Sequence, residues 1–147
     1  MSTDTPPITG RCYCGALSVS ARALPDVVTY CHCNTCRRLS GAPVSVFAAF
    51  AEDAVAVTPV SGLSKRMFGT VERAFCTECG TQIYATYDYL PDQVYLPTGL
   101  LDQAHALPPT LHGHVASALP WLHIDDNLPQ NDKSSRDHFK ATKTETR

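Results

Sequence analysis

Three thiols fall within six residues in Cys31-His32-Cys33-Asn34-Thr35-Cys36, and the basic pair Arg37-Arg38 follows at once. Sulfur atoms spaced this closely along one loop can converge on a single point. Zinc is a metal ion that takes thiolate ligands in a tetrahedral arrangement, so this stretch predicts a zinc site. We therefore interpret the rest of the chain as a scaffold built around thiolate–metal sites.

Two further cysteine pairs flank this stretch. Cys12 and Cys14 form a Cys-x-Cys pair upstream, and Cys76 and Cys79 form a Cys-x-x-Cys pair downstream. The seven cysteines thus divide into a set of four and a set of three. Each flanking pair supplies half of a tetrahedron, which predicts a closed, structural zinc that joins segments far apart in the sequence.

The remaining set is Cys31, Cys33 and Cys36. Three protein ligands with a free fourth position are the pattern of a catalytic zinc. The spacing by itself leaves two alternatives open. One is a redox-active thiol cluster, and the other is a second closed site whose fourth ligand is a histidine.

Several other residues near these sets are candidates for function. His32 lies between two cysteines, and an extended loop would point it away from the metal, so we expect it at the surface or supporting a ligand. His112 and His114 resemble an alternating ligand pair, but we expect them to be structural. Arg37 and Arg38 either bind a substrate carboxylate or form a solvated face.

The composition describes an ordinary globular protein. The chain has 147 residues, of which 44% are hydrophobic and 18% are charged, and this length predicts one domain. A formal net charge of −2 gives no electrostatic reason to expect nucleic-acid binding. No apolar run reaches about 18 residues, so no membrane span is expected.

The first residues lack the basic and apolar regions of a secretory signal. We therefore expect a cytoplasmic protein. In that reducing compartment cysteines serve as metal ligands more often than as disulfides. The odd cysteine count agrees, because pairing would leave one thiol over.

Short segments of alternating or β-branched residues, separated by turn residues, predict a mainly β fold. We expect strands at 16–21, 27–30, 44–50, 54–58, 65–68, 81–87 and 93–96, about one helical turn at 35–39, and a segment at 111–124 that closes the sheet. Trp121, after Pro120, is expected in the core. The domain is expected to span 9–130, between a loose arm at 1–8 and a polar, disordered tail at 131–147.

Three motifs occur in a fixed order: Gly10-x-Cys12-x-Cys14-Gly15, then Cys31-His32-Cys33-x-x-Cys36-Arg37, then Phe75-Cys76-x-x-Cys79-Gly80-Thr81. They resemble the motifs of the glutathione-dependent formaldehyde-activating (GFA) family, to which centromere protein V also belongs. His112, Ser117 and Pro120-Trp121 resemble that family's C-terminal signature. The resemblance runs from about Gly10 to Pro129.

The resemblance implies a single zinc-stapled domain of stacked antiparallel sheets. It implies a structural zinc on Cys12, Cys14, Cys76 and Cys79 and a second, catalytic zinc on Cys31, Cys33 and Cys36. The implied activity is that of a carbon–sulfur lyase that forms or cleaves S-hydroxymethylglutathione. The expected partners are therefore a glutathione-like thiol and an aldehyde. The residues that bind glutathione and the oligomeric state are not implied by these motifs.

Overall fold

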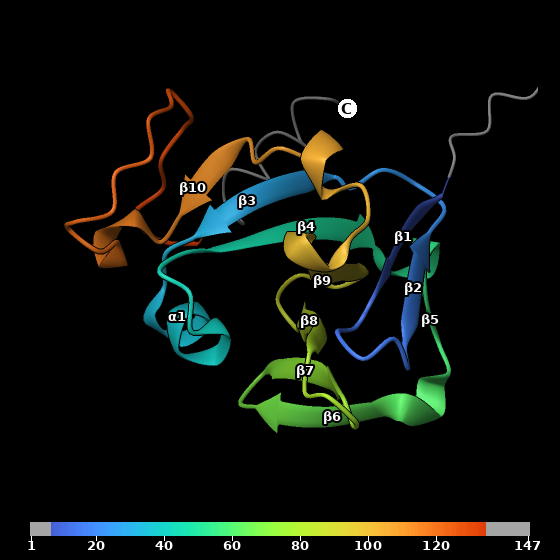
Figure 1. Ribbon diagram of the computed structural model, residues 1–147. Coiled ribbons are helices and arrows are strands. Elements are labelled where there is room, and N and C mark those ends of the chain that lie inside the picture. Colours follow the sequence, from blue (N-terminus) through green and yellow to red (C-terminus); the bar gives the residue numbers. More distant parts are fainter. Residues whose placement is uncertain (1–6, 135–147) are drawn as a thin grey trace, which may run out of the picture. The chain divides into compact units, whose positions relative to one another are not determined.

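The computed structural model describes residues 7–134, which form ten β-strands in two sheets, one α-helix and five 3₁₀ turns (Figure 1). The predicted mainly β fold is confirmed. The described chain falls into two compact units. Unit 1 comprises residues 7–26 and 48–108, and unit 2 comprises residues 27–47 and 109–134. The two units are described separately below.

The strands are β1 (Ile8–Arg11), β2 (Ser18–Ala21), β3 (Val27–Cys31), β4 (Ser45–Ala51), β5 (Val55–Thr58), β6 (Leu63–Phe68), β7 (Val71–Cys76), β8 (Gln82–Tyr87), β9 (Gln93–Pro97) and β10 (Leu111–Gly113). The helix is α1 (Asn34–Ser40). The 3₁₀ turns are η1 (Glu52–Ala54), η2 (Val60–Gly62), η3 (Thr98–Leu100), η4 (Ala104–Ala106) and η5 (Val115–Ser117).

Unit 1 contains two sets of antiparallel strands. β1, β2 and β5 form a three-stranded sheet in that order, with Gly10 opposite Val19 and Val19 opposite Val57. β6, β7, β8 and β9 follow one another as hydrogen-bonded neighbours (Figure 1). A register shift between Ala74 and Phe75 marks a β-bulge just before β7 ends. The bulge re-aims the strand as it enters the turn at Cys76.

The alternation read from the sequence explains which faces of unit 1 are buried. In β2 the two serines are exposed while Val19 and Ala21 are buried, as the two-residue period of a strand requires. Four large side chains of this unit are fully buried, namely Leu17, Phe50, Ile83 and Leu96. Burying side chains of this size stabilises a fold by roughly 1.5–3 kcal/mol each.

Unit 2 is built from β3, β10 and α1. β10 pairs with β3 in parallel, which places His112 opposite Tyr30 and Gly113 opposite Cys31. α1 begins directly after Cys33, whose side chain caps the helix by accepting from the backbone N–H of Cys36. The helix ends at Gly41, which has φ of 73° and donates its N–H to the carbonyl of Arg37. A left-handed residue at this position ends a helix with little strain only if it is glycine.

Four differences from the sequence predictions stand out. β1 begins at Ile8, which is buried, so strand structure starts within the segment expected as an arm; residues 1–6 lie outside the described residues. β7 was not predicted. Within 111–124 only β10 is a strand. Trp121 is 64% exposed, so its predicted place in the core was wrong.

The predicted tail at 131–147 is described only as far as Ser134. The backbone N–H of Asn131 donates to the carbonyl of His112, and the carbonyl of Lys133 accepts from His114. The start of this segment is therefore hydrogen-bonded to β10 and the residue after it. Along residues 7–134, no helix is long and apolar enough to cross a bilayer.

Candidate metal centres

The structure brings together the sulfur atoms of Cys12, Cys14, Cys76 and Cys79, the four-cysteine cluster, within 4.8 Å of one another. The Cys12–Cys14 sulfur distance is 3.6 Å and the Cys14–Cys76 distance is 3.8 Å. A tetrahedral zinc with Zn–S bonds near 2.3 Å requires sulfurs about 3.8 Å apart. The spacing of these atoms therefore already fits a bound zinc, which agrees with the grouping predicted from the sequence.

Two hairpin turns of unit 1 supply these four sulfurs, one after β1 and one between β7 and β8. Each turn closes on itself: the N–H of Gly15 donates to the carbonyl of Cys12, and that of Gly80 donates to the carbonyl of Cys76. The two glycines have φ of 81° and 79°, a conformation that other residues adopt only with strain. The shared backbone geometry explains why glycine follows both cysteine pairs.

Thr81 links the two turns. Its hydroxyl accepts the backbone N–H of Tyr13 at 3.1 Å and lies 3.1 Å from the sulfur of Cys79. The hydrogen bond from Thr81 to sulfur lowers the pKa of Cys79 to about 5. Because metal ligands must be thiolates, a lowered pKa favours metal binding at neutral pH. The sequence analysis quoted Thr81 within a motif but gave it no role.

The second group, Cys31, Cys33 and Cys36, is the three-cysteine cluster, and it lies entirely in unit 2. The sulfur of Cys31 is 3.4 Å from that of Cys33 and 3.3 Å from that of Cys36. The end of β3 and the first turn of α1 hold the three side chains together. Within the described residues no histidine or carboxylate joins this set. The chain therefore offers a metal three ligands and leaves a fourth position for another group.

Charge is unevenly shared among these three thiols when no metal is present. Hydrogen bonds from Cys31 and Cys36 hold the pKa of Cys33 well below its usual range. The same contacts raise the pKa of Cys31 and of Cys36. The lowered pKa favours the thiolate form of Cys33, and the backbone N–H of Cys36 also donates to its sulfur. A metal ion is a stronger partner for this charge than two S–H groups, and its binding would displace the remaining protons.

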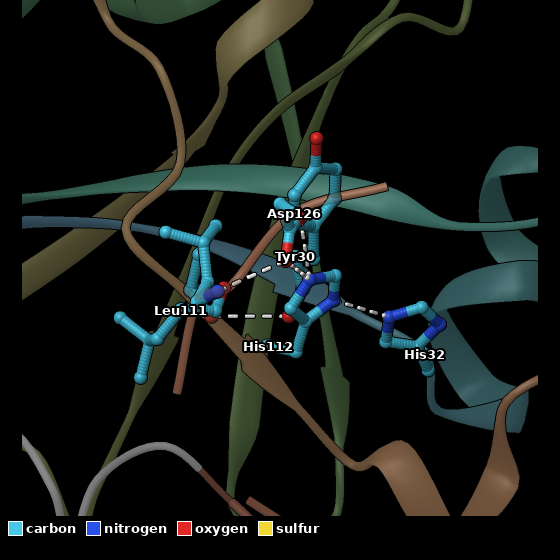
Figure 2. A network of polar contacts seen from close by, with 7 residues as sticks. Tyr30, His32, Leu111, His112 and Asp126 are labelled. Atoms are coloured by element: carbon cyan, nitrogen blue, oxygen red, sulfur yellow. Dashed lines mark hydrogen bonds and ion pairs between the residues drawn. The ribbon is translucent and has the colours of Figure 1, made fainter. Parts of the chain in front are cut away.

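His32, which lies between Cys31 and Cys33 in the sequence, begins a chain of polar side chains that continues to His112 and Asp126 (Figure 2). Nε2 of His32 lies 2.9 Å from Nδ1 of His112, and Nε2 of His112 lies 3.0 Å from the carboxylate of Asp126. The ring of Tyr30 stacks on that of His112, with centroids 4.5 Å apart. His32 and His112 are 5% and 4% exposed. His32 is therefore not at the surface, and His112 is the structural residue that was expected.

The direction of these hydrogen bonds follows from Asp126. The N–H of Leu128 and the His112 side chain both lower the pKa of Asp126, so its carboxylate is ionised and accepts. In the tautomer in which Nε2 of His112 donates to Asp126, Nδ1 of His112 accepts from Nε2 of His32. Burial lowers the pKa of His32, which favours its neutral form. Nδ1 of His32 is then a buried acceptor, and no group of the described chain bonds to it.

Arg37 fixes the backbone of this region. Its guanidinium donates to the carbonyl of His32 at 2.9 Å, to the carbonyl of Ser117 and to the side chain of Asn34. These contacts tie the loop of the three-cysteine cluster to η5. The sequence left two interpretations for the arginine pair, binding of a substrate carboxylate or a solvated face. Arg37 instead donates hydrogen bonds that hold the backbone in place. Arg38 is exposed.

A cavity of about 500 Å³ lies in unit 2 next to this polar chain. Its walls combine two buried imidazoles with apolar and polar side chains; the lining residues are His32, His112, Val115, Ala118, Leu122, His123, Ile124, Asp125 and Gln130. His32 is flanked in sequence by two members of the three-cysteine cluster, but none of the three cysteines lines the cavity. Its size suits a small organic ligand.

These features define a class: a mainly β protein with one complete and one incomplete cluster of thiols, each able to hold a metal ion. The chain belongs to the glutathione-dependent formaldehyde-activating enzyme family, since the family's sequence model matches residues 7–117. This confirms the resemblance noted in the sequence. Zinc fits both clusters by the chemistry of their donors, and the sulfur spacing of the four-cysteine cluster also fits it.

Two comparisons with individual proteins agree with this. An uncharacterized lyase of Schizosaccharomyces pombe is 31% identical over 83 residues, which cover 56% of this chain and 59% of that protein. The chain thus matches less than two thirds of the relative's length. A crystal structure of a Rhodobacter sphaeroides protein matches with a TM-score of 0.55 and 19% identity, covering 83% of this chain and 98% of the other. At that identity the likeness shows the fold alone.

Proposed function

We propose that the protein is a zinc-dependent carbon–sulfur lyase of the GFA type, which forms or cleaves the adduct of a glutathione-like thiol and an aldehyde. The observation that carries the proposal is the three-cysteine cluster: its sulfurs converge, and the described chain supplies no fourth ligand. An incomplete ligand set is the usual form of a catalytic zinc site, whereas a structural site is closed. The family assignment, and a relative whose name includes lyase, also support a lyase activity.

The reaction needs a thiolate and a way to protonate an oxygen. In the forming direction the sulfur of the thiol bonds to the aldehyde carbon, the thiol proton is released, and the carbonyl oxygen takes up a proton to become a hydroxyl. Cleavage reverses each step. Zinc, when bound, would keep the substrate thiol ionised near neutral pH, as zinc does for coordinated thiols and water.

The chain's own residues position the site. The N–H of Cys36 fixes the sulfur of Cys33, and Arg37 holds the backbone around both. The cavity beside His32 provides room for the organic part of a thiol adduct. A reducing compartment, for which we propose the cytoplasm, would keep these thiols free to bind metal.

A calorimetric titration of the zinc-loaded protein with glutathione tests the proposal, with Cys36→Ser as the test variant and Thr35→Ala as the matched control. Thr35 is exposed on the same helix and contributes no sulfur. We expect glutathione to bind the parent protein and Thr35→Ala alike and to lose binding in Cys36→Ser. Loss of formaldehyde–glutathione turnover in Cys36→Ser, measured above the spontaneous reaction, should follow.

Circular dichroism on the same variants separates catalysis from structure. A catalytic site predicts that Cys36→Ser stays folded with nearly the parent melting temperature. If Cys36→Ser melts far below the parent and the parent shows no heat with glutathione, the three-cysteine cluster is structural. The protein would then be a zinc-stabilised binding module without catalysis.

A further inference from the structure

Arg73 is a buried cation for which residues 7–134 supply no ion-pair partner. It lies in β7 of unit 1 and is 3% exposed. Its Nε and Nη1 atoms are inaccessible to solvent and make no hydrogen bond. Along residues 7–134, Arg22 forms an ion pair with Asp53 and His112 contacts Asp126, and neither contact involves Arg73. Within the described chain, Nε and Nη1 of this guanidinium therefore lack acceptors, and the group has no counter-charge.

A second arginine lies directly opposite. In the antiparallel β6–β7 pair, Arg66 is the register partner of Arg73. Residues opposite each other point to the same face of the sheet, with Cβ atoms about 5 Å apart. Arg66 is exposed. Like Arg73, it forms no ion pair with another residue of the described chain. Two like charges in this relation destabilise a sheet unless something neutralises them.

The nearest acidic side chain in the sequence is on the wrong face. Glu72 precedes Arg73, so strand alternation directs it to the opposite side of the sheet. There it lines a cavity together with Lys65 and Tyr84. On the face of Arg66, a separate cavity of about 330 Å³ is lined by Ser64, Arg66, Phe68, Phe75, Cys76, Thr77 and Gly80. Arg66 lines this cavity and Arg73 does not, so the arginine face combines a buried positive charge at Arg73 with open volume at Arg66.

Burial of this kind is costly for arginine in particular. A buried lysine or histidine can become neutral by releasing its proton, but arginine does not do so in proteins. An unpaired buried charge costs several kcal/mol, and replacing it by an apolar side chain commonly stabilises a protein. A position that retains such a cost is a candidate for ligand binding, because strain and unsatisfied groups concentrate at functional sites.

We infer that Arg73 and Arg66 form a binding site for a carboxylate. A planar guanidinium presents several N–H donors to one carboxylate and matches its geometry better than an ammonium group does. Arg73 supplies buried N–H donors to the carboxylate. Arg66 supplies an exposed positive charge that attracts the anion and contacts it from the solvent side. The site lies in unit 1, and neither of its arginines belongs to a cysteine cluster. The carboxylate can belong to the thiol substrate or to a separate small acid.

Thermal unfolding of the zinc-loaded protein tests this inference, with chloride replaced stepwise by acetate at constant ionic strength. A ligand that binds the folded state raises the melting temperature with its concentration. We expect acetate to raise it in the parent protein and in the control Arg22→Gln, whose arginine forms an exposed ion pair. Arg66→Gln should weaken acetate binding about tenfold.

Arg73→Met gives the distinguishing result. Its melting temperature in chloride should exceed that of the parent, because an unpaired buried charge is removed, yet it should not respond to acetate. Arg73→Lys retains the charge and serves if Arg73→Met does not fold; we expect it to fold and to bind acetate more weakly than the parent. A parent protein that does not distinguish acetate from chloride, or an Arg73→Met protein that responds like the parent, would overturn the inference.

Two further arms identify the source of the carboxylate. Glutathione and its diethyl ester share the thiol but differ in their carboxylates. If glutathione binds more tightly than the ester in the parent but equally in Arg73→Met, the site holds the substrate's carboxylate. If both bind alike while acetate still stabilises the parent, the site takes a separate acid. An acetate response that persists in Cys36→Ser keeps this test distinct from failure of the lyase proposal.

Discussion

The four-cysteine cluster and the three-cysteine cluster offer a metal ion the same kind of ligand in different numbers. In the first, two hairpin turns of unit 1 each give two sulfurs, and the Cys14–Cys76 distance of 3.8 Å already fits a zinc tetrahedron. In the second, one loop and the start of α1 in unit 2 give three sulfurs at 3.3–3.4 Å. The number of protein ligands, rather than their type, separates the two.

Their connections also differ. The four-cysteine cluster brings together cysteines 62 residues apart, so a metal bound there would link distant segments of the chain. The three-cysteine cluster spans six residues that Arg37 and the His32–His112 contact already hold in place. We therefore expect loss of metal to unfold the chain in the first case and to affect ligand binding in the second.

The largest effect is expected for Cys76→Ser. Zinc binding in small structural sites contributes about 10–16 kcal/mol, which is comparable with the whole stability of a domain, about 5–15 kcal/mol. Removing one ligand should abolish cooperative thermal unfolding of unit 1, measured by circular dichroism. Cys36→Ser is the matched control. Equal melting temperatures in the two variants would contradict the expectation that only the four-cysteine cluster is needed for folding.

Metal content gives the next test. Native mass spectrometry of the parent protein should show two zinc ions per chain, and Cys36→Ser should show one. In competition with a chelator of intermediate affinity, the zinc of the three-cysteine cluster should leave first, because it has fewer protein ligands and its loss does not require unfolding. Simultaneous loss of both ions would indicate that the clusters are coupled.

A smaller loss is expected for His112→Phe. The variant leaves His32 and Asp126 without their shared partner, and each unsatisfied buried group costs about 1–3 kcal/mol. Denaturant unfolding measures this loss, and His105→Phe, at an exposed position, should be neutral. Zinc in the four-cysteine cluster should be retained.

The pH dependence of Asp126→Asn follows from the lowered pKa of Asp126. A carboxylate that ionises more readily in the folded state stabilises it above its unfolded pKa, 3.8, and this contribution is lost as the pH falls toward the folded value. The stability difference between Asp126→Asn and the parent should therefore be constant at neutral pH and shrink below pH 3.8. A difference that grows on acidification would contradict the assigned hydrogen bonds.

The smallest effect is expected for Thr81→Val, about 0.5–1.5 kcal/mol for the lost hydrogen bonds. Without this hydroxyl the pKa of Cys79 should rise, so protons compete better for the sulfur. Zinc release on acidification, followed with a colorimetric indicator, should then occur at a higher pH than in the parent. Thr77→Val is the control, because its hydroxyl donates to the carbonyl of Gly62 and not to sulfur.

Local spacing allowed the sequence to predict much of this protein. The division of seven cysteines into four and three, the glycines of the two turns and most strands depend on residues a few positions apart. Such patterns are fixed by the two-residue period of strands and by the reach of a thiol from a tight turn. The family resemblance rested on the same local motifs and was confirmed.

Only the tertiary structure decided the contacts between distant residues. The His32–His112 hydrogen bond joins positions 80 apart, and nothing near Asp126 in the sequence marks it as their partner. The register of β6 on β7 sets Arg66 opposite Arg73, and the folded chain buries one and exposes the other. Burial and pairing depend on which strands become neighbours, and the alternation within a single strand does not specify its neighbour.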